Sequence, residues 1–470
     1  MFATRLYRLN VNVNIRIFSS LIAMLALHAT AAQAAPPGMQ CDRAASTTEI
    51  AICADADLLR LDTQLSAVYG KLAGAQPQQH ARLRQAQLAW LKARDQCGSD
   101  THCSSARYEE RIAALQAQLR KAIAYKPDSV DLQAIEDLRQ AVEAARKTDP
   151  VFPLERAIDA IRIKTGMTKF ANVNDKKQPY TGAKFPTVRP AGVSRDEWRA
   201  LQASRIDGGG ENGVASYTLM DVDGDGRRDL FIDSYSGGTG LFSFVSALHR
   251  EGGKFVDELE GDGHLYLING RGANQAADLI KLRGRVYVAY RNSYYGVDNI
   301  YLLRPLTVVG EVPRLAVHYR YRLSVPKVQK DEGKGTVTRL DSALHAAITR
   351  ALAQVSSEVA RDAGLQDKPL CPVPDTVKDD DRDAYYSYGA GHYAYEIVRD
   401  MPVWVGGQCF IGRLIDWFGG YSRKDGLFAQ LRVRSLKGDD EQTYAVHGLR
   451  TAIAGGIKTS VGKVGGDNGM

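Results

Sequence analysis

Four cysteines between residues 41 and 103 constrain the fold of this chain more than any other feature. Cys41, Cys53, Cys97 and Cys103 accompany a helical apolar pattern that follows directly on an export signal. A helical segment of about 65 residues buries too small a core to be stable without cross-links. Because an exported chain keeps its cysteines oxidised, the pattern predicts a small helical domain held by two disulfides.

The first 34 residues have the composition of a secretory signal peptide. They hold three arginines and no acidic residue, then an apolar run over 17–27, then the small-residue site Ala32-Gln33-Ala34. The alternative is an uncleaved membrane anchor, but the run is short and is interrupted by Ser19, Ser20, His28 and Thr30. We therefore expect a mature protein that begins at Ala35 and resides in the periplasm or outside the cell.

The mature chain of about 436 residues is long enough for two or three domains. Removing three signal arginines from 61 basic residues leaves 58 against 54 acidic ones, a net charge near +4. That charge is too small to indicate nucleic-acid binding, and no basic stripe interleaved with aromatic residues occurs. After the signal, no run of about 18 apolar residues predicts a membrane span.

Helical spacing predicts three helices around the first four cysteines. The Ser46-Thr-Thr-Glu49 sequence is a capping box and predicts the start of the first helix. Short connections make neighbouring helices antiparallel, so all four cysteines lie at one end of the bundle. Of the three possible pairings we favour Cys53 with Cys97 and Cys41 with Cys103, because each joins distant segments. The apolar faces carry Leu58, Leu61, Leu65, Val68 and Leu72, then Leu83 and Trp90, then Tyr108, Ile112, Leu115 and Leu119.

This segment resembles a known family over residues 41 to about 120. The resemblance rests on the cysteine spacing, on Gln87-x-x-Trp90-x-x-x-Arg94-Asp95-x-Cys97, and on Tyr108-x-x-Arg111-Ile112-x-x-Leu115. These residues are similar to the lysozyme-inhibitor LprI-like N-terminal domain of secreted bacterial proteins. The resemblance implies an extracytoplasmic helical domain, linked in some members to inhibition of host lysozyme. It also implies that the partner is a protein or another component of the cell envelope, and lysozyme is one candidate.

Trp90 and Arg94 have a structural and a functional interpretation. Trp90 lies on the apolar stripe and would fill the core, while Arg94 near a helix end could pair with an acid such as Asp62. Alternatively, the exposed charges of the module fill a partner's cleft, with residues 98–102 between two cysteines as a protruding loop.

Residues 126–192 are predicted to form a helical and loop-rich linker. Lys126-Pro127-Asp128 ends the third helix, and amphipathic patterns follow over 131–146 and from Leu154 onward. Residues 172–192 are rich in proline, glycine and polar residues. We place a domain boundary between about 125 and 170.

Four aspartates between residues 221 and 229 predict a cation site. Asp221, Asp223, Asp225 and Asp229 occupy loop positions 1, 3, 5 and 9, Gly226 supplies the turn, and the Arg227 carbonyl could add a ligand. A standard helix-loop-helix calcium site is excluded, because position 12 is an isoleucine and a strand follows. The loop resembles the calcium loops of FG-GAP or VCBS-type repeats. We predict a structural Ca²⁺ ion there, since four close carboxylates repel one another without a cation.

Around this loop, residues 193–455 form a predicted β-rich domain with an inserted long helix. Alternating strands are expected at several segments, the helix runs over 340–359, and Cys371 pairs with Cys409. Residues 456–470 are rich in glycine and lysine and are expected to be a loose tail. The fold class is therefore α+β and multidomain. The expected strands include 214–220, 241–248, 285–290, 300–303, 315–323, 394–398, 402–405, 408–415 and 427–433.

None of the common short catalytic motifs occurs in the chain. There is no Gly-x-Ser-x-Gly, His-Glu-x-x-His, Cys-x-x-Cys or phosphate loop. The sequence therefore favours a secreted, non-catalytic envelope protein that binds a macromolecule. The alternative is a periplasmic hydrolase of cell-envelope glycan, with the tyrosine-rich residues 385–395, Trp404 and Trp417 lining a sugar groove.

Overall fold

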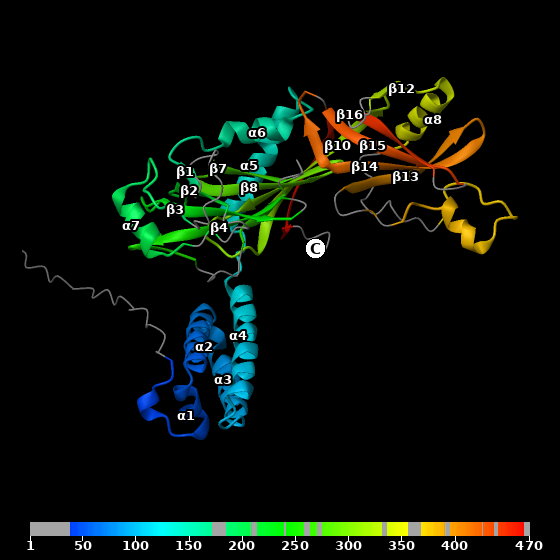
Figure 1. Ribbon diagram of the computed structural model, residues 1–470. Helices are drawn as coiled ribbons and strands as arrows, with labels where there is room; N and C mark the ends of the chain where they lie inside the picture. Colours follow the sequence, from blue (N-terminus) through cyan, green and yellow to red (C-terminus); the bar gives the residue numbers. More distant parts are fainter. Residues whose placement is uncertain are drawn as a thin grey trace, which may run out of the picture. The chain divides into compact units, whose positions relative to one another are not determined.

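The computed structural model describes most of the chain from residue 38 to residue 464 (Figure 1). The predicted signal peptide lies outside the described residues. The chain divides into two compact units, Met1–Leu119 and Arg120–Met470. The described ranges are 38–171, 185–206, 208, 214–238, 241–257, 264–269, 275–330, 336–355, 368–389, 391, 395–424, 426–436 and 440–464, without the side chains of 417–420.

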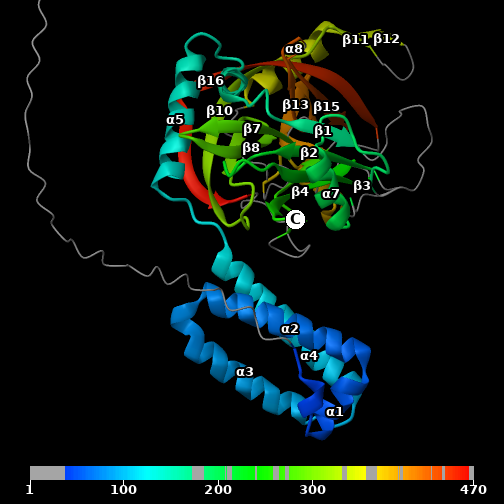
Figure 2. The ribbon, with the colours of Figure 1, turned by 90° about the vertical axis from the view of Figure 1, so that its left-hand side faces the viewer.

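The first unit is helical (Figure 2). Its helices are α1 (Thr47–Ala54), α2 (Ala56–Ala75), α3 (His80–Asp95) and α4 (Thr101–Ile123), with 3₁₀ turns at Cys41–Arg43 and Pro77–Gln79. The capping box at Ser46 forms as predicted. The helix expected to continue from it is divided, because the Asp55 carboxylate accepts the amides of Asp57 and Leu58 and starts α2. The predicted apolar stripe of α2 is buried throughout.

Both disulfides of this unit differ from the pairing favoured above. Cys41 bonds to Cys53, and Cys97 bonds to Cys103. All four lie at the same end as predicted, since Thr48 of α1 donates to the backbone of Asp95 at the end of α3, 3.1 Å away. The separate helix α1 brings Cys53 back toward Cys41, and a turn at Gly98, with φ of 58°, reverses the chain between the other two. Each bridge therefore closes a short local loop.

Two antiparallel sheets form the second unit (Figure 1). The eight-stranded sheet has the order β13-β14-β15-β16-β10-β9-β8-β7, and the six-stranded sheet has the order β1-β2-β3-β4-β5 with β6 also on β4. The strands of the larger sheet are β7 (Gln275–Leu282), β8 (Arg285–Tyr294), β9 (Val297–Leu303), β10 (Glu311–Ser324), β13 (Glu396–Val405), β14 (Gln408–Ser422), β15 (Gly426–Arg434) and β16 (Glu441–Lys463). Those of the smaller sheet are β1 (Thr168–Ala171), β2 (Ala215–Met220), β3 (Asp229–Gly237), β4 (Phe242–Glu251), β5 (Lys254–Val256) and β6 (Tyr266–Asn269), and β11 (Val328–Lys330) pairs separately with β12 (Val337–Arg339).

These elements stack in layers. Helices α5 (Ser129–Arg146), α6 (Pro153–Ile161) and α8 (Ser342–Ala353) cover one face of the eight-stranded sheet, and Figure 2 shows α5 alongside β16. On the opposite face, β8, β9 and β10 pack against the six-stranded sheet. Helix α7 (Arg195–Ala203) covers the far face of that smaller sheet. Alternate residues of each strand point to opposite faces, so β9, which lies between two layers, is buried from Asp298 to Leu303.

Two predictions about the second unit are wrong. Helices α5 and α6 bury Leu138, Val142 and Ile158 in the main core, so this part of the expected linker belongs to the β-rich unit. The expected loose tail is a strand as far as Lys463, because β16 pairs with β10 over that stretch. Helix α8 covers residues 342–353 of the expected long helix, and residues 356–367 lie outside the described residues.

The predicted disulfide of the second unit is confirmed. Cys371 bonds to Cys409 and packs with Tyr385 and Ile411 in a small separate cluster. With the two bridges of the first unit, all six cysteines are paired. No helix among the described residues is long and apolar enough to span a membrane.

Candidate functional site

The predicted cation loop connects β2 to β3. Gly224 and Gly226 adopt φ of 84° and 85°, a left-handed conformation that glycine takes without strain. The Asp221 carboxylate accepts the amides of both glycines, at 2.7 and 3.1 Å. Asp223 and Asp225 accept the amides two residues further on. The loop is therefore a series of tight turns that keeps its carboxylates on the inside.

Two overlapping groups of possible ligands converge in this loop. The carboxylate oxygens of Asp221, Asp223 and Asp229 lie within 4.8 Å of one another, and so do ligand atoms of Asp223, Asp225 and His249. His249 lies on β4, and its Nδ1 is 3.1 Å from Asp229 and 3.6 Å from Asp223. His249 comes 20 residues after Asp229, so the spacing within the loop does not predict it as a ligand.

Asp229 anchors the loop to the sheet. It is fully buried at the start of β3, and its two oxygens accept the amides of Val222 and Arg250 at 3.2 and 2.9 Å. Burial raises the pKa of the Asp229 carboxyl and outweighs the opposing effect of these amides. The negative charge of Asp223 raises that pKa further. A cation bound between the two carboxylates would have the opposite effect and favour the ionised form of Asp229.

Arg227 and Arg228 have different roles in the same loop. The amide of Arg227 donates to Asp225, while the role of its carbonyl as a ligand stays a prediction. The Arg228 guanidinium bonds to both oxygens of Glu197 at the start of α7, at 2.7 and 2.6 Å, and to the Thr168 hydroxyl on β1. Burial raises the pKa of Glu197, but Arg228 and the Ser194 amide outweigh it and lower that pKa to about 2. This ion pair fixes the loop to two neighbouring elements.

In the tyrosine-rich region, arginine side chains cover two of the described tyrosine rings. Arg413 and Arg434 stack on the ring of Tyr388, and Arg432 stacks on the ring of Tyr395. Trp404 on β13 is 44% exposed. Residues 390 and 392–394 and the Trp417 side chain lie outside the described part of the chain.

In the helical unit, a buried polar network joins three helices. The Tyr108 hydroxyl on α4 donates to Asp62 on α2 at 2.7 Å and accepts from Arg94 on α3 at 3.1 Å. The expected link between Arg94 and Asp62 therefore runs through Tyr108, while Arg94 pairs directly with Asp95 at 2.6 Å. Burial raises the pKa of the Tyr108 hydroxyl, and its bond to Asp62 adds to this effect, so the hydroxyl stays protonated.

Trp90 is partly buried against this network. Its ring meets the Tyr108 ring edge-on, with centroids 5.3 Å apart, and its indole N–H donates to the Arg107 carbonyl. Arg94 lies over the faces of both rings. The structural interpretation of Trp90 and Arg94 is therefore the correct one: both residues hold the helices together.

These contacts give each motif residue of the helical unit a structural role. Residues 41–125 match the family model described as lysozyme inhibitor LprI. We refer to this segment as the LprI domain. The match covers the helical unit and its continuation to the end of α4. Neither a curated protein nor a solved structure matches the chain.

The cysteine end of the LprI domain presents a rigid exposed surface. The expected protruding loop is a tight turn, in which the Asp100 amide donates to Cys97 and the Asp100 carboxylate accepts the amide of Cys103. Thr101 and His102 already belong to α4. On the adjacent helix α1, Ile50 is 56% exposed although it is large and apolar.

Proposed function

We propose that this protein is a non-catalytic extracytoplasmic binding protein whose LprI domain binds and inhibits a lysozyme. The observation that supports this proposal is the match of residues 41–125 to the lysozyme inhibitor family. The export signal predicted from the sequence and the three disulfides are consistent with a location outside the cytoplasm.

The cysteine end of the domain is the contact surface that we propose. Two local disulfides hold its backbone before binding, so little conformational entropy is lost on association. Ile50 projects from this surface and is the apolar side chain that a partner's cleft could bury. The domain holds eleven basic and nine acidic residues between positions 41 and 125, so overall charge contributes little to attraction.

A lysozyme inhibition assay with the mature full chain tests the proposal. Wild type should slow lysis of a cell-wall substrate, and Ile50→Ser should weaken inhibition about tenfold or more, as expected for loss of a central apolar anchor. Leu88→Ser is the matched control, because Leu88 on α3 is 50% exposed but lies away from the disulfides. No inhibition and no binding by wild type would refute the lysozyme assignment, and equal loss in both variants would refute the proposed surface.

We also propose that the loop over 221–229 binds Ca²⁺ as a structural ion. Asp221, Asp223 and Asp229 supply oxygen ligands from three positions, which is the donor type that Ca²⁺ prefers. His249 offers a nitrogen atom 3.1 Å from Asp229 and 3.6 Å from Asp223, a donor more typical of transition metals. Metal analysis of protein purified without chelator should find calcium, whereas zinc in its place would refute the choice of ion.

A further inference from the structure

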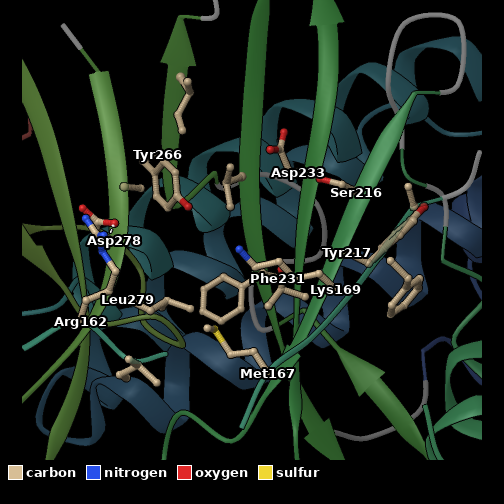
Figure 3. A pocket seen from close by; sticks show the side chains of 17 residues that line it. Arg162, Met167, Lys169, Ser216, Tyr217, Phe231, Asp233, Tyr266, Asp278 and Leu279 are labelled. Atoms are coloured by element: carbon tan, nitrogen blue, oxygen red, sulfur yellow. Dashed lines mark ion pairs between the residues drawn. The ribbon is translucent and has the colours of Figure 1, made fainter. Parts of the chain in front are cut away.

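A cavity of about 560 Å³ lies between the two sheets of the second unit (Figure 3). One side is formed by β1, β2, β3, β4 and β6 of the smaller sheet. The other side is formed by β7 and by residues 162–167, which precede β1. The volume falls within the range of small-molecule sites in proteins, about 300 to 1,000 Å³. The cavity is distant in sequence from the LprI domain, and the functions proposed above do not use it.

Strand register aligns the polar residues of this cavity. Ser216, Asp233, Val245 and Tyr266 form one row across β2, β3, β4 and β6, since each is the direct partner of the next. Lys169, Thr218 and Phe231 form the neighbouring row across β1, β2 and β3. Residues two apart along a strand share a face, so both rows point into the same space.

The cavity has an apolar side. Phe231, Met167 and Leu279 contribute to its lining, and Figure 3 shows them together below Tyr266 and Asp233. Asp278 on β7 is already neutralised, because Arg162 bonds to it at 2.8 Å and to Asp159 at 2.6 Å. This acid is therefore not the principal charge available to a ligand.

Two opposite charges in the cavity lack an ionic partner. Among the described residues, no basic group pairs with Asp233, whose carboxylate is hydrogen-bonded by Ser243. Within the same part of the chain, Lys169 also has no ion pair. Burial raises the pKa of Asp233, and burial together with Asp233 and Asp278 raises the pKa of the Tyr266 hydroxyl, so this hydroxyl remains a hydrogen-bond donor beside the carboxylates.

We propose that this cavity binds a short zwitterionic peptide of two or three residues with apolar side chains. Its ammonium group bonds to Asp233, its carboxylate bonds to Lys169, and its side chains rest on Phe231, Met167 and Leu279. A ligand without an ammonium group would leave the half-buried carboxylate of Asp233 without an ionic partner, at a cost in affinity. A ligand without a carboxylate would lose its ion pair with Lys169, which is exposed. The two strands that carry Lys169 and Asp233 are separated by β2, which places their backbones about 10 Å apart and matches the ends of such a peptide.

Calorimetric titration of the mature full chain with the tripeptide alanyl-leucyl-alanine tests the proposal. The free peptide should bind, and its N-acetylated and C-amidated forms should each bind at least about tenfold more weakly, because each lacks one charge. Absence of binding by the free peptide at millimolar concentration would overturn the proposal. Equal binding of all three forms would also overturn it, since the charges would then have no role.

Variants assign each peptide end to its partner. Asp233→Asn should weaken binding of the free peptide at least about tenfold and should make acetylation of the peptide nearly without effect. Lys169→Gln should weaken binding of the free peptide to a similar extent and should make amidation of the peptide nearly without effect. Asp375→Asn and Lys164→Gln are exposed controls outside the cavity and should leave affinity unchanged. If Asp233→Asn leaves the effect of acetylation intact, the ammonium group binds elsewhere and the assignment is wrong.

Discussion

Arg228 and Glu197 form a bidentate ion pair that connects the aspartate loop to the first turn of α7. The side chains are 24% and 14% exposed, so solvent screens the pair only partly. The same glutamate closes the capping box of α7 with Ser194. One carboxylate thus holds both the helix start and the loop.

This arrangement predicts an acid-dependent loss of stability. The pKa of Glu197 is lowered from 4.5 to about 2, so its contribution is present above pH 4.5 and is lost as pH falls toward 2. Glu197→Gln should lower the free energy of unfolding at pH 7 by about 2 kcal/mol and flatten its decline between pH 4.5 and 2. Urea unfolding at several pH values measures both effects. Glu251→Gln, at an exposed position, is the control, and an equal pH dependence of wild type and Glu197→Gln would contradict the prediction.

Calcium should raise the melting temperature of the wild-type protein relative to chelator. Binding to the folded state alone stabilises it by about 2.7 kcal/mol at a hundredfold excess over Kd. The double replacement of Asp223 and Asp225 by Ala should abolish the rise, whereas the same replacement at the exposed Asp375 and Asp379 should retain it. An unchanged wild-type melting temperature would show that the loop is only an acidic turn.

The disulfides of the LprI domain should be recovered as two local pairs. Proteolysis without reduction, followed by mass spectrometry, should yield the cross-links Cys41–Cys53 and Cys97–Cys103, whose sequence separations are 12 and 6. A disulfide that closes a loop this short stabilises the folded state by about 2 to 3 kcal/mol, because it lowers the conformational entropy of the unfolded chain. Replacing both members of one pair by Ser should therefore weaken the domain without unfolding the other unit. Recovery of Cys53 joined to Cys97 would contradict the pairing.

Tyr108→Phe should loosen the helical unit. The substitution keeps the ring but leaves buried Asp62 and Arg94 each without one hydrogen-bond partner, which costs about 1 to 3 kcal/mol. Hydrogen exchange of the slowest amides in α2 and α4 should accelerate roughly tenfold. Tyr69→Phe, at a partly exposed position of α2, is the control. An exchange rate unchanged by Tyr108→Phe would show that the hydroxyl adds nothing to stability.

Local signals predicted the helices of the LprI domain well. The Ser46 capping box, the leucines of α2 and the cysteine positions all depend on spacing along one helix or between neighbours. The disulfide pairing was not predictable in this way. It depends on the break at Asp55, which a continuous helical pattern conceals.

The second unit shows why other features were missed. β16 has Gly448 and Arg450 at positions that face the core, so its alternation of apolar residues is weak. A Cβ atom on Gly448 would come within 2.9 Å of Leu323, which explains why a larger residue does not fit. His249 joins the cation loop only through the pairing of β3 with β4. Such contacts arise between segments distant in sequence and leave no periodic pattern within either one.

The position of β16 has a consequence for folding while the chain is synthesised. This strand is the latest in sequence of its sheet, yet it lies in the interior between β15 and β10, and its Arg450 bonds to Glu155 nearly 300 residues earlier. Until residues 441–463 have been synthesised, β10 and β15 each have an open edge that can pair with another chain. The unit therefore cannot complete its larger sheet strand by strand as it is made. A holding chaperone that binds open strand edges should increase its yield.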